Sequence, residues 1–236
     1  MKIKTVIVFV SALLISHSAP AFEGRITAEL TRGGTVSVLL YTVGTNYLCI
    51  EQTNTDWPHA RDIVDLQTGE WMLLFPNNRT FVRLKTGGAT PASPSGMPAM
   101  PPPGAGMPAM PLPPMEKIDL TATGETTNLL GLACARYEIK RRGQTMEIWA
   151  TDQVAGFEPY RENQPHRFGP PLIEEHWGEL LTAKNLFPLL AVLKLDNGAE
   201  RLRFEVKSIT PAKVTDDSGE LFQPPTGYIE IQPLPF

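Results

Sequence analysis

Methionine is the residue type whose spacing most suggests chemistry in this sequence. Five methionines gather between positions 97 and 115 and include two M-x-x-M pairs. Thioethers are soft ligands that select Cu(I), so this segment is a candidate for weak copper binding. The alternative, which we favour, is a low-complexity linker that expanded by duplication, because residues 96–101 recur as residues 106–111. The five are Met97, Met100, Met107, Met110 and Met115.

Cysteine chemistry rests on two residues, Cys49 and Cys134. Disulfides persist in exported proteins. A bridge between these two cysteines would close a loop of about 85 residues, worth about 4 kcal/mol in the chain-entropy model. The sequence leaves two alternatives open, a disulfide or two separate buried thiols. There is no C-x-x-C pair and no neighbouring histidine, so we do not predict catalytic use.

Histidine and carboxylate pairs are present but incomplete as sites. His176 and Glu179 have an H-x-x-E spacing, but a zinc site needs three or four converging ligands. We therefore interpret the pair as part of a solvated helix face. Asp62 and Asp65 fall on opposite faces of a predicted strand, which argues against a carboxylate dyad. No serine-hydrolase or nucleotide-binding motif occurs. We predict a protein that is not an enzyme, with no cofactor and no metal site.

The elements that position these residues are mainly strands. Residues 133–140 and 145–152 alternate between apolar and polar side chains, and the polar residues 141–144 separate them. A period of two is typical of a half-buried strand, so this stretch predicts a β-hairpin. We expect the other strands to pair around it.

The first part of the chain shows the same alternation with turns about every ten residues, which is typical of an antiparallel sheet. Asn and Gly cluster in several of these turns. The inward positions expected here include Val36, Val38 and Leu40 in one strand and Val82 and Leu84 in another. The strands predicted between residues 22 and 85 are 25–31, 36–40, 47–52, 61–66, 70–75 and one that ends at residue 85.

Residues 86–115 interrupt this pattern. Ten of the 23 prolines lie between Pro91 and Pro114. Proline removes amide donors and favours extended conformations, so the segment cannot join a sheet interior. We predict a disordered Pro/Met-rich insertion between two strands of one sheet.

After the hairpin, the sequence predicts one helix and three more strands. Apolar residues recur at helical spacing over residues 172–185, and acidic residues lie in the first turn, where the helix dipole favours them. Pro188 is expected to end this helix. Strands are predicted over residues 189–195, around residues 202–207, and over residues 228–231.

Residues 1–21 have the pattern of an export signal. Two lysines precede an apolar run, and Ala19-Pro20-Ala21 fits a cleavage site. The run is too short to span a bilayer, so we predict no membrane span after cleavage and a location in the periplasm or outside the cell. Residues 22–236 then form a single β-rich domain with 19 basic and 25 acidic side chains, a net charge of −6. This charge disfavours nucleic acid as a partner.

Three stretches carry a family resemblance. One is TGETTNLLGLACARYEI with GQTMEIWATD, at residues 123–152. The others are ARDIVDL with WMLLFP and TFV, at residues 60–82, and the proline followed by Gly227-Tyr228. These stretches resemble an exported bacterial family of domains of unknown function, similar in build to the periplasmic lipoprotein carriers LolA and LolB. The resemblance covers about half of the mature chain, and its motifs are structural.

The resemblance implies a mainly β, α+β fold: a single curved antiparallel sheet, or LolA-like half-barrel, with the helix over its concave face. It also implies an apolar cleft and a non-catalytic module that binds a lipid, or a lipoprotein acyl chain, in the cell envelope. The alternative is a structural or interaction domain whose Pro/Met-rich arm docks an envelope protein partner or weakly binds copper. Candidate cleft residues are Val36, Val38, Leu40, Val82, Leu84, Ile148, Trp177, Leu181, Leu202 and Phe204.

Overall fold

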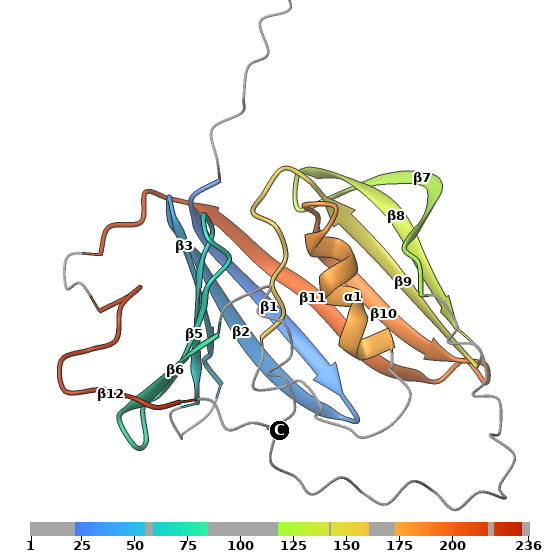
Figure 1. Cartoon of the computed structure of the whole chain (residues 1–236). Coiled ribbons are helices and arrows are strands. Elements are labelled where there is room, and N and C mark those ends of the chain that lie inside the picture. The colour runs from blue at the N-terminus through green and yellow to red at the C-terminus, as the bar shows by residue number, and fades with distance from the viewer. Residues whose placement is uncertain are drawn as a thin grey trace, which may run out of the picture.

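The computed structural model describes residues 22–54, 59–84, 118–141, 143–160, 173–216 and 220–232. Within these ranges twelve strands form one sheet, and one helix lies against it (Figure 1). The predicted signal segment 1–21 and the Pro/Met-rich segment 86–115 lie outside the described residues. In chain order the elements are β1 (Gly24–Arg32), β2 (Thr35–Val43), β3 (Tyr47–Gln52), β4 (Arg61–Asp65), β5 (Trp71–Phe75), β6 (Thr80–Leu84), β7 (Thr121–Leu129), β8 (Leu132–Arg141), β9 (Gln144–Thr151), α1 (Ile173–Thr182), β10 (Phe187–Leu195), β11 (Glu200–Pro211) and β12 (Ile229–Glu230).

The sheet consists of two meanders that meet at its centre. Strands β1 to β6 follow one another across one half, and strands β7 to β11 follow one another across the other. The halves join where β1 pairs antiparallel with β11. Gly24 begins this central pair with a φ of 152°, and a Cβ at this position would lie 2.3 Å from the carbonyl oxygen of Thr210. Glycine is therefore needed for the two strands to approach here.

The predicted hairpin of residues 133–140 and 145–152 is present as β8 and β9. Strands β7 and β10 pair on either side of this hairpin, which lies near one edge of the sheet rather than at its centre. Strand β6, which precedes the Pro/Met-rich segment, lies near the opposite edge and is followed only by the two-residue strand β12. The segment between β6 and β7 thus joins opposite sides of the sheet.

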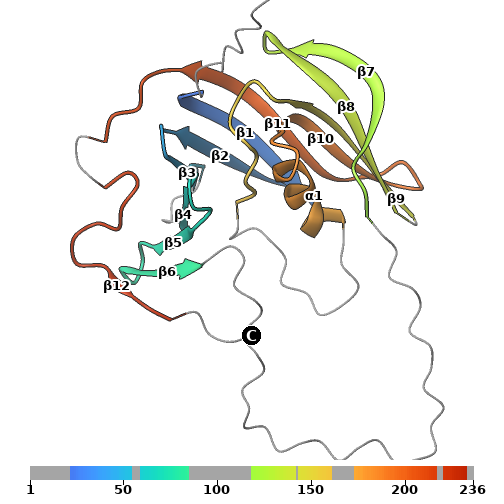
Figure 2. The same cartoon turned by 45° about the horizontal axis from the view of Figure 1, so that its top comes forward.

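The sheet is strongly curved, and α1 lies on its concave face (Figures 1 and 2). This is the LolA-like half-barrel that the resemblance implied. Ile173, Trp177 and Leu181 recur every four residues along α1 and are buried against the sheet. Helix α1 ends at Thr182, earlier than Pro188, and the expectation that Pro188 stops it is wrong. Pro188 instead lies in β10, at an irregularity in the pairing with β9, where a missing amide donor is tolerated.

Two hydrophobic clusters form on opposite faces of the sheet. The main cluster fills the concave face beneath α1. The second lies on the convex face of strands β3 to β6, where Cys49 and Ile63 pack with Phe222 from the C-terminal segment. The Phe222 ring stacks on Tyr47 at 5.7 Å between centroids. Residues after β11 therefore cover one part of the convex face, as the red segment in Figures 1 and 2 shows.

Strand β2 faces the opposite way from the prediction. Leu39 and Tyr41 belong to the main cluster, and their side chains are 1% and 0% exposed. Val36, Val38 and Leu40 lie on the other face, and Val36 is 44% exposed. The prediction that these three residues point inward is wrong. The sequence TVSVLLYTV has apolar residues at both odd and even positions, so the alternation does not decide which set is buried.

The two cysteines are free thiols, each buried in a different cluster. Cys49 lies in β3 and Cys134 in β8, and five strands of the sheet separate them. A disulfide requires Cα atoms within about 7 Å of each other, so the bridge that the sequence left open does not form. The second alternative, two separate buried thiols, holds. None of the described helices is long and apolar enough to cross a membrane.

Candidate ligand-binding site

An aromatic cluster forms the floor of the concave face beneath α1. Phe157 lies at its centre, with its ring centroid 4.7 Å from that of Trp177 and 5.5 Å from that of Phe204. Tyr41 extends the cluster from β2, and its ring meets the ring of Phe187 edge-on at 5.4 Å. Such tilted and edge-to-face pairs add stability beyond the area that they bury. The rings come from β2, β10, β11, α1 and the segment after β9.

The helix is held over this floor by the segment after β9. Gly178 faces Pro159, and a Cβ at Gly178 would lie 2.8 Å from the Cγ atom of Pro159. The absence of a side chain therefore allows the segment to approach α1 closely. Near the end of α1, the Thr182 hydroxyl donates a hydrogen bond to the carbonyl oxygen of Phe157. These contacts position Phe157 and Trp177 relative to each other.

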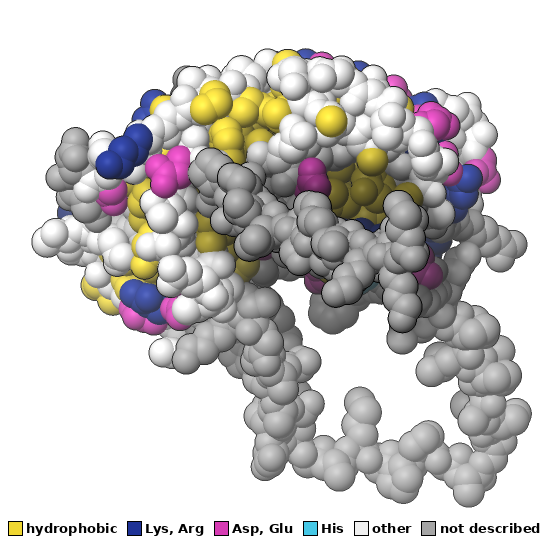
Figure 3. Space-filling model, turned by 90° about the horizontal axis from the view of Figure 1, so that it is seen from above, with side chains coloured by type: hydrophobic (Ala, Val, Ile, Leu, Met, Phe, Trp, Pro, Cys, Tyr) yellow, Lys and Arg dark blue, Asp and Glu magenta, His cyan; other side chains and the backbone are white. Residues whose placement is uncertain are grey.

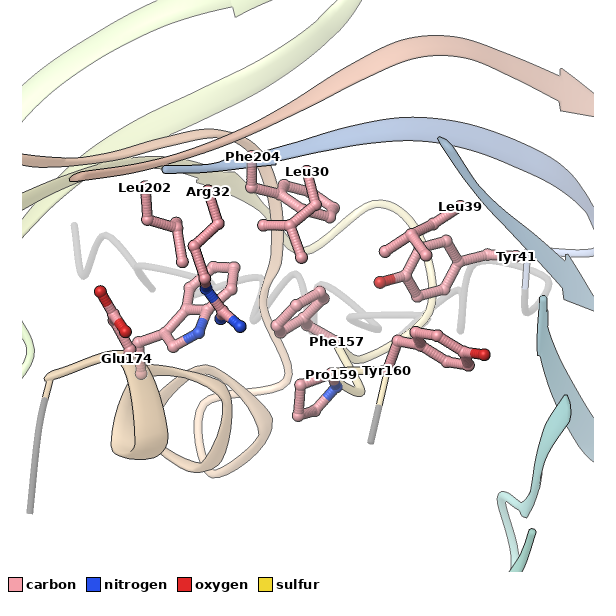
Figure 4. A pocket seen from close by; sticks show the side chains of 11 residues that line it. Leu30, Arg32, Leu39, Tyr41, Phe157, Pro159, Tyr160, Glu174, Leu202 and Phe204 are labelled. Atoms are coloured by element: carbon pink, nitrogen blue, oxygen red, sulfur yellow. The ribbon is translucent and has the colours of Figure 1, made fainter. Parts of the chain in front are cut away.

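A narrow hollow with about 20 Å³ of free volume, room for about one water molecule, lies between α1, the segment after β9 and strands β1, β2 and β11 (Figure 4). Most of its wall is apolar or aromatic, and Figure 3 shows hydrophobic side chains gathered inside recesses of the surface. Ligand pockets are usually concave and mostly apolar, with a few polar groups, and this hollow has that kind of lining on a much smaller scale. Its lining residues are Leu30, Arg32, Leu39, Tyr41, Phe157, Pro159, Tyr160, Glu174, Trp177, Leu202 and Phe204.

One end of the hollow carries charge. Glu174 from α1 is 4% exposed and forms an ion pair with Arg201 at 2.7 Å. Arg32, at the end of β1, lines the same end of the hollow (Figure 4). Two arginines and one glutamate leave this end with a formal charge of +1. A buried carboxylate is tolerated only with such a partner.

The other end carries two tyrosines. The hydroxyl of Tyr160 donates a hydrogen bond to the carbonyl oxygen of Ala60 at 2.5 Å. The hydroxyl of Tyr41 is buried and has no hydrogen-bond partner among the described residues. Burial, followed by the charges of Asp62 and Glu158, raises the pKa of Tyr41 far above its ordinary value of 10.0. The Tyr41 hydroxyl therefore keeps its proton at neutral pH.

Three of the candidate cleft residues line the hollow: Trp177, Leu202 and Phe204. Ile148 and Leu181 belong to the same main cluster but lie outside the wall of the hollow. Leu84 packs against the edge of this cluster, and Val82 is buried nearby on β6. Val36, Val38 and Leu40, on the opposite face of β2, take no part in the hollow.

Sequence reasoning missed the residues that complete the hollow. Leu39 and Tyr41 were missed because β2 carries apolar residues on both faces, so the sequence does not show which face is buried. Phe157, Pro159 and Tyr160 belong to a segment without regular structure, which has no periodicity to mark it. The feature that could have identified these residues is composition, because two aromatic residues occur in a proline- and glycine-rich stretch between a strand and a helix.

The other groups singled out in the sequence do not converge. The His176 Nδ1 and Glu179 Oε2 atoms lie 3.4 Å apart on the exposed side of α1. Asp62 is fully buried, whereas Asp65 accepts hydrogen bonds from the amides of Gln67 and Thr68, which lower the pKa of its carboxyl. No group of three or more metal-ligating side chains is present in the part of the chain that the structure describes.

The convex face of the central strands is covered by charged side chains rather than apolar ones. Arg136 on β8 contacts Glu125 at 2.8 Å and Glu147 at 3.6 Å, and Lys194 contacts Glu147 at 3.1 Å. Lys207 on β11 pairs with Glu29 on β1 at 3.1 Å. Ladders of opposite charge across strands are typical of a solvated sheet face. The apolar hollow is therefore confined to the concave side.

Comparison with known proteins places the chain in a family. Residues 109–228 match the model of DUF4412, a domain of unknown function, and this is just over half of the 236 residues. The chain belongs to the DUF4412 family. The match begins near the end of the Pro/Met-rich segment and includes strands β7 to β11, helix α1 and the C-terminal segment. None of the curated proteins matches the chain by sequence.

Several solved structures are similar to this DUF4412 protein at low sequence identity. PNGF-II has a TM-score of 0.50 and 17% identity, over 91% of this chain and 32% of that one. This chain thus spans about a third of the length of PNGF-II. An uncharacterized conserved protein from Thermus thermophilus has a TM-score of 0.48 and 9% identity, over 89% of each chain. MucB, in the MucA/MucB complex of Pseudomonas aeruginosa, has a TM-score of 0.41 and 11% identity, over 84% of this chain and 55% of that one.

Proposed function

We propose that this DUF4412 protein is a non-catalytic binding module of the cell envelope. It takes an apolar chain, from a lipid or from a lipoprotein acyl group, beside α1, where the narrow hollow has to widen to hold it. The observation that carries the proposal is the composition of that hollow, in which nine of the eleven lining residues are apolar or aromatic. Burial of apolar ligand surface there contributes about 25 cal/mol per Å².

The absence of catalysis is part of this proposal. The groups in the hollow that are able to transfer a proton are Glu174, which is paired with Arg201, and the two tyrosines. The pKa of Tyr41 is raised by burial, which makes its hydroxyl a hydrogen-bond donor rather than a nucleophile at neutral pH. Export to the periplasm or beyond rests on the signal predicted at residues 1–21, which would bring the hollow to envelope lipids.

Native mass spectrometry of protein purified from the exported fraction, with organic extraction of bound material, tests the proposal. We expect a co-purifying lipid or acyl species, and displacement of a fluorescent fatty acid by added lipid. Protein that carries nothing and also takes up no fluorescent fatty acid would rule the proposal out. Recovery of the protein from the cytoplasmic fraction alone would overturn its envelope location.

A pair of variants localises binding to the hollow. Leu30 lines the hollow and is 9% exposed, whereas Val36 lies on the opposite face and is 44% exposed. Leu30→Arg places a charge in the apolar wall, and we expect it to weaken fatty-acid uptake by about tenfold or more. Val36→Arg introduces the same side chain on the exposed face and should leave uptake unchanged. Equal loss in both variants would contradict binding in the hollow.

The second candidate is a structural or interaction domain whose arm docks an envelope protein. The dense aromatic cluster favours it, because packed rings already occupy much of the concave face. Deletion of residues 86–115 would then abolish capture of a partner by crosslinking in cells, while fatty-acid uptake by the full chain would be absent. Titration with Cu(I) of full-length and deleted protein tests the weak copper site in the same arm.

A further inference from the structure

A second recess lies on the convex face, between strands β3 to β6 and the C-terminal segment. Its free volume is about 80 Å³, about four times that of the hollow beside α1. The C-terminal segment that borders it is the red segment beside β3, β5 and β6 in Figure 1. We call this space the convex recess, and its wall includes Tyr47, Ile63, Asp65, Met72 and Phe222.

The strand register brings these side chains together. Tyr47 lies opposite Asp65 in the pairing of β3 with β4, and Ile63 lies opposite Met72 in the pairing of β4 with β5. Met72 in turn lies opposite Arg83 on β6. Residues directly opposite each other share a face of the sheet. The pairing therefore places a ring, a carboxylate and a guanidinium around two buried apolar side chains, Ile63 and Met72.

The charges of the convex recess do not balance. Asp65, Glu70 and Arg83 line it, which gives a formal charge of −1. The Arg83 guanidinium is held by Glu70 at 3.3 Å and by Glu230 at 3.5 Å. Asp65 forms no ion pair with any residue that the structure describes. Two backbone amides donate hydrogen bonds to its Oδ1 atom and lower the pKa of its carboxyl, so it is charged at neutral pH.

The remaining walls favour a cation with an apolar stem. The Tyr47 ring stacks on Phe222 with 5.7 Å between centroids and 24° between planes. Aromatic rings attract cations, and the charge of Asp65 adds to this attraction. A neutral ligand would take water from the Asp65 carboxylate without replacing its interactions. The apolar side chains of Ile63 and Met72 suit contact with methylene groups.

We propose that the convex recess binds an alkylammonium group, with its nitrogen at the Asp65 carboxylate and its methylenes against Ile63 and Met72. The free volume fits this size. At about 15 Å³ for each water, 80 Å³ holds about five, and a chain of four methylenes with an ammonium has as many heavy atoms. The group belongs either to a free amine or to a lysine side chain. This site lies on the opposite face from the hollow and does not depend on lipid binding.

The test is an amide NMR titration of the exported protein with three probes of similar size: n-butylammonium, 1-butanol and butyrate. We expect saturable shifts with butylammonium at Tyr47, Asp65 and Phe222. Its binding should be about tenfold or more tighter than that of butanol, because the neutral probe lacks the charge-assisted hydrogen bond. Butyrate should not bind. Equal binding of butylammonium and butanol, or no saturable shift at these residues, would overturn the inference.

Asp65→Asn removes the charge but keeps an acceptor oxygen for the two amides of the turn. We expect it to weaken butylammonium binding by about fivefold or more and to leave butanol binding unchanged. Asp196→Asn is the matched control, because it makes the same change of charge at an exposed turn outside the recess. Equal losses in the two variants would mean that only the overall charge attracts the cation, and the inference would fail.

A second variant keeps the test decisive if Asp65→Asn does not fold. Tyr47→Leu removes the aromatic wall and keeps every charge of the recess. It should weaken butylammonium binding by about twofold to fivefold, as loss of a cation–π contact does. Unchanged binding in Tyr47→Leu, as in Asp65→Asn, would place the cation outside the recess.

A fourth probe identifies the source of the ammonium group. Lysine with both its amino and carboxyl ends capped carries the same four methylenes and ammonium on a bulky backbone. If it binds as tightly as butylammonium, the recess takes a lysine side chain, and if it binds more weakly, the recess takes a free amine. Failure of fatty-acid uptake would overturn the proposed function and leave this inference standing, because the two sites lie on opposite faces of the sheet.

Discussion

Leu39 and Leu40 are neighbours of the same type on strand β2, yet their side chains lie on opposite faces of the sheet. Leu39 is 1% exposed and lines the hollow, whereas Leu40 is only partly buried on the convex side. In the pairing with β1, Leu39 lies opposite Ala28, which is fully buried in the main cluster, and Leu40 lies opposite Thr27. The two residues thus form a matched pair for testing which face carries the core.

We expect Leu39→Ala to lower the free energy of unfolding by about 2 to 4 kcal/mol, because it leaves a cavity in a packed core. Leu40→Ala should cost about 1 kcal/mol or less, because its side chain is already partly in water. Urea unfolding of both variants checks this. Equal costs, or a larger cost at Leu40, would show that the orientation of β2 is wrong.

The contact between Gly178 and Pro159 leads to a second prediction. Gly178→Ala gains helix propensity, worth about 1 kcal/mol, but places a Cβ 2.8 Å from Pro159, where overpacking costs about 1 to 3 kcal/mol. We expect net destabilisation, together with a change in Trp177 fluorescence as α1 is displaced. Glu179→Ala, at an exposed position of the same helix, is the control. A stabilised Gly178→Ala protein would mean that the segment does not press on α1.

The C-terminal segment protects Cys49, which gives a third prediction. Cys49 is fully buried beneath a cluster that includes Phe222, and burial raises the pKa of its thiol. In native wild-type protein we expect both thiols to react slowly with a thiol reagent. Phe222→Ala should speed the labelling of Cys49 by about tenfold or more and leave Cys134 protected, because opening of this segment is local. Mass spectrometry of the labelled peptides distinguishes the two cysteines.

A different result would change the interpretation of the segment. If Cys49 and Cys134 became reactive together in Phe222→Ala, the variant would have unfolded globally rather than released the C-terminal residues. If neither changed, Phe222 would not cover the convex face in solution. The control is Ile231→Ala, because Ile231 lies in the same C-terminal segment and is 41% exposed. Phe236 lies outside the described residues and is not used.

Alkaline pH should destabilise the protein, because burial raises the pKa of Tyr41 and of the thiols of Cys49 and Cys134. The pKa values of Cys49 and Tyr41 are raised in the folded protein from ordinary values of 9.0 and 10.0. The unfolded chain therefore releases these protons first as pH rises. Stability is fully present below about pH 8.5 and falls above it, by up to about 1.4 kcal/mol per pH unit for each group.

Urea unfolding between pH 7 and pH 10.5 measures this slope. Cys49→Ala should reduce the slope that begins near pH 9, and Tyr41→Phe should reduce the part that begins near pH 10. Leu40→Ala alters no titrating group, so it should shift the whole curve without changing its slope. A slope that is the same in all four proteins would exclude Cys49 and Tyr41 as its source.

Much of the local structure followed from the sequence. Strand β3 was predicted at the residues it occupies, and β1, β4 and β5 to within one or two residues, because β1 alternates strictly and turn residues separate the others. The same applies to α1, whose residues Ile173, Trp177 and Leu181 share one face. The sequence also favoured the family and the half-barrel through short motifs such as TGETTNLLG.

The candidate site followed only in part. Trp177, Leu202 and Phe204 were predicted because each belongs to a regular element with a clear apolar face. Phe157 was not, since it lies in an irregular segment and acquires its role only when that segment packs under α1. Tyr41 was missed because both faces of β2 are rich in apolar residues.

The sequence by itself determined where strands and the helix form, since side-chain periodicity and turn residues act over a few positions. Only the tertiary structure decided that β1 pairs with β11, that Cys49 and Cys134 remain apart, and that one face of β2 is covered. These outcomes depend on which apolar surfaces meet over long separations in the chain. Any such contact buries apolar surface and is favourable, so only the complete sheet determines which of the possible contacts form.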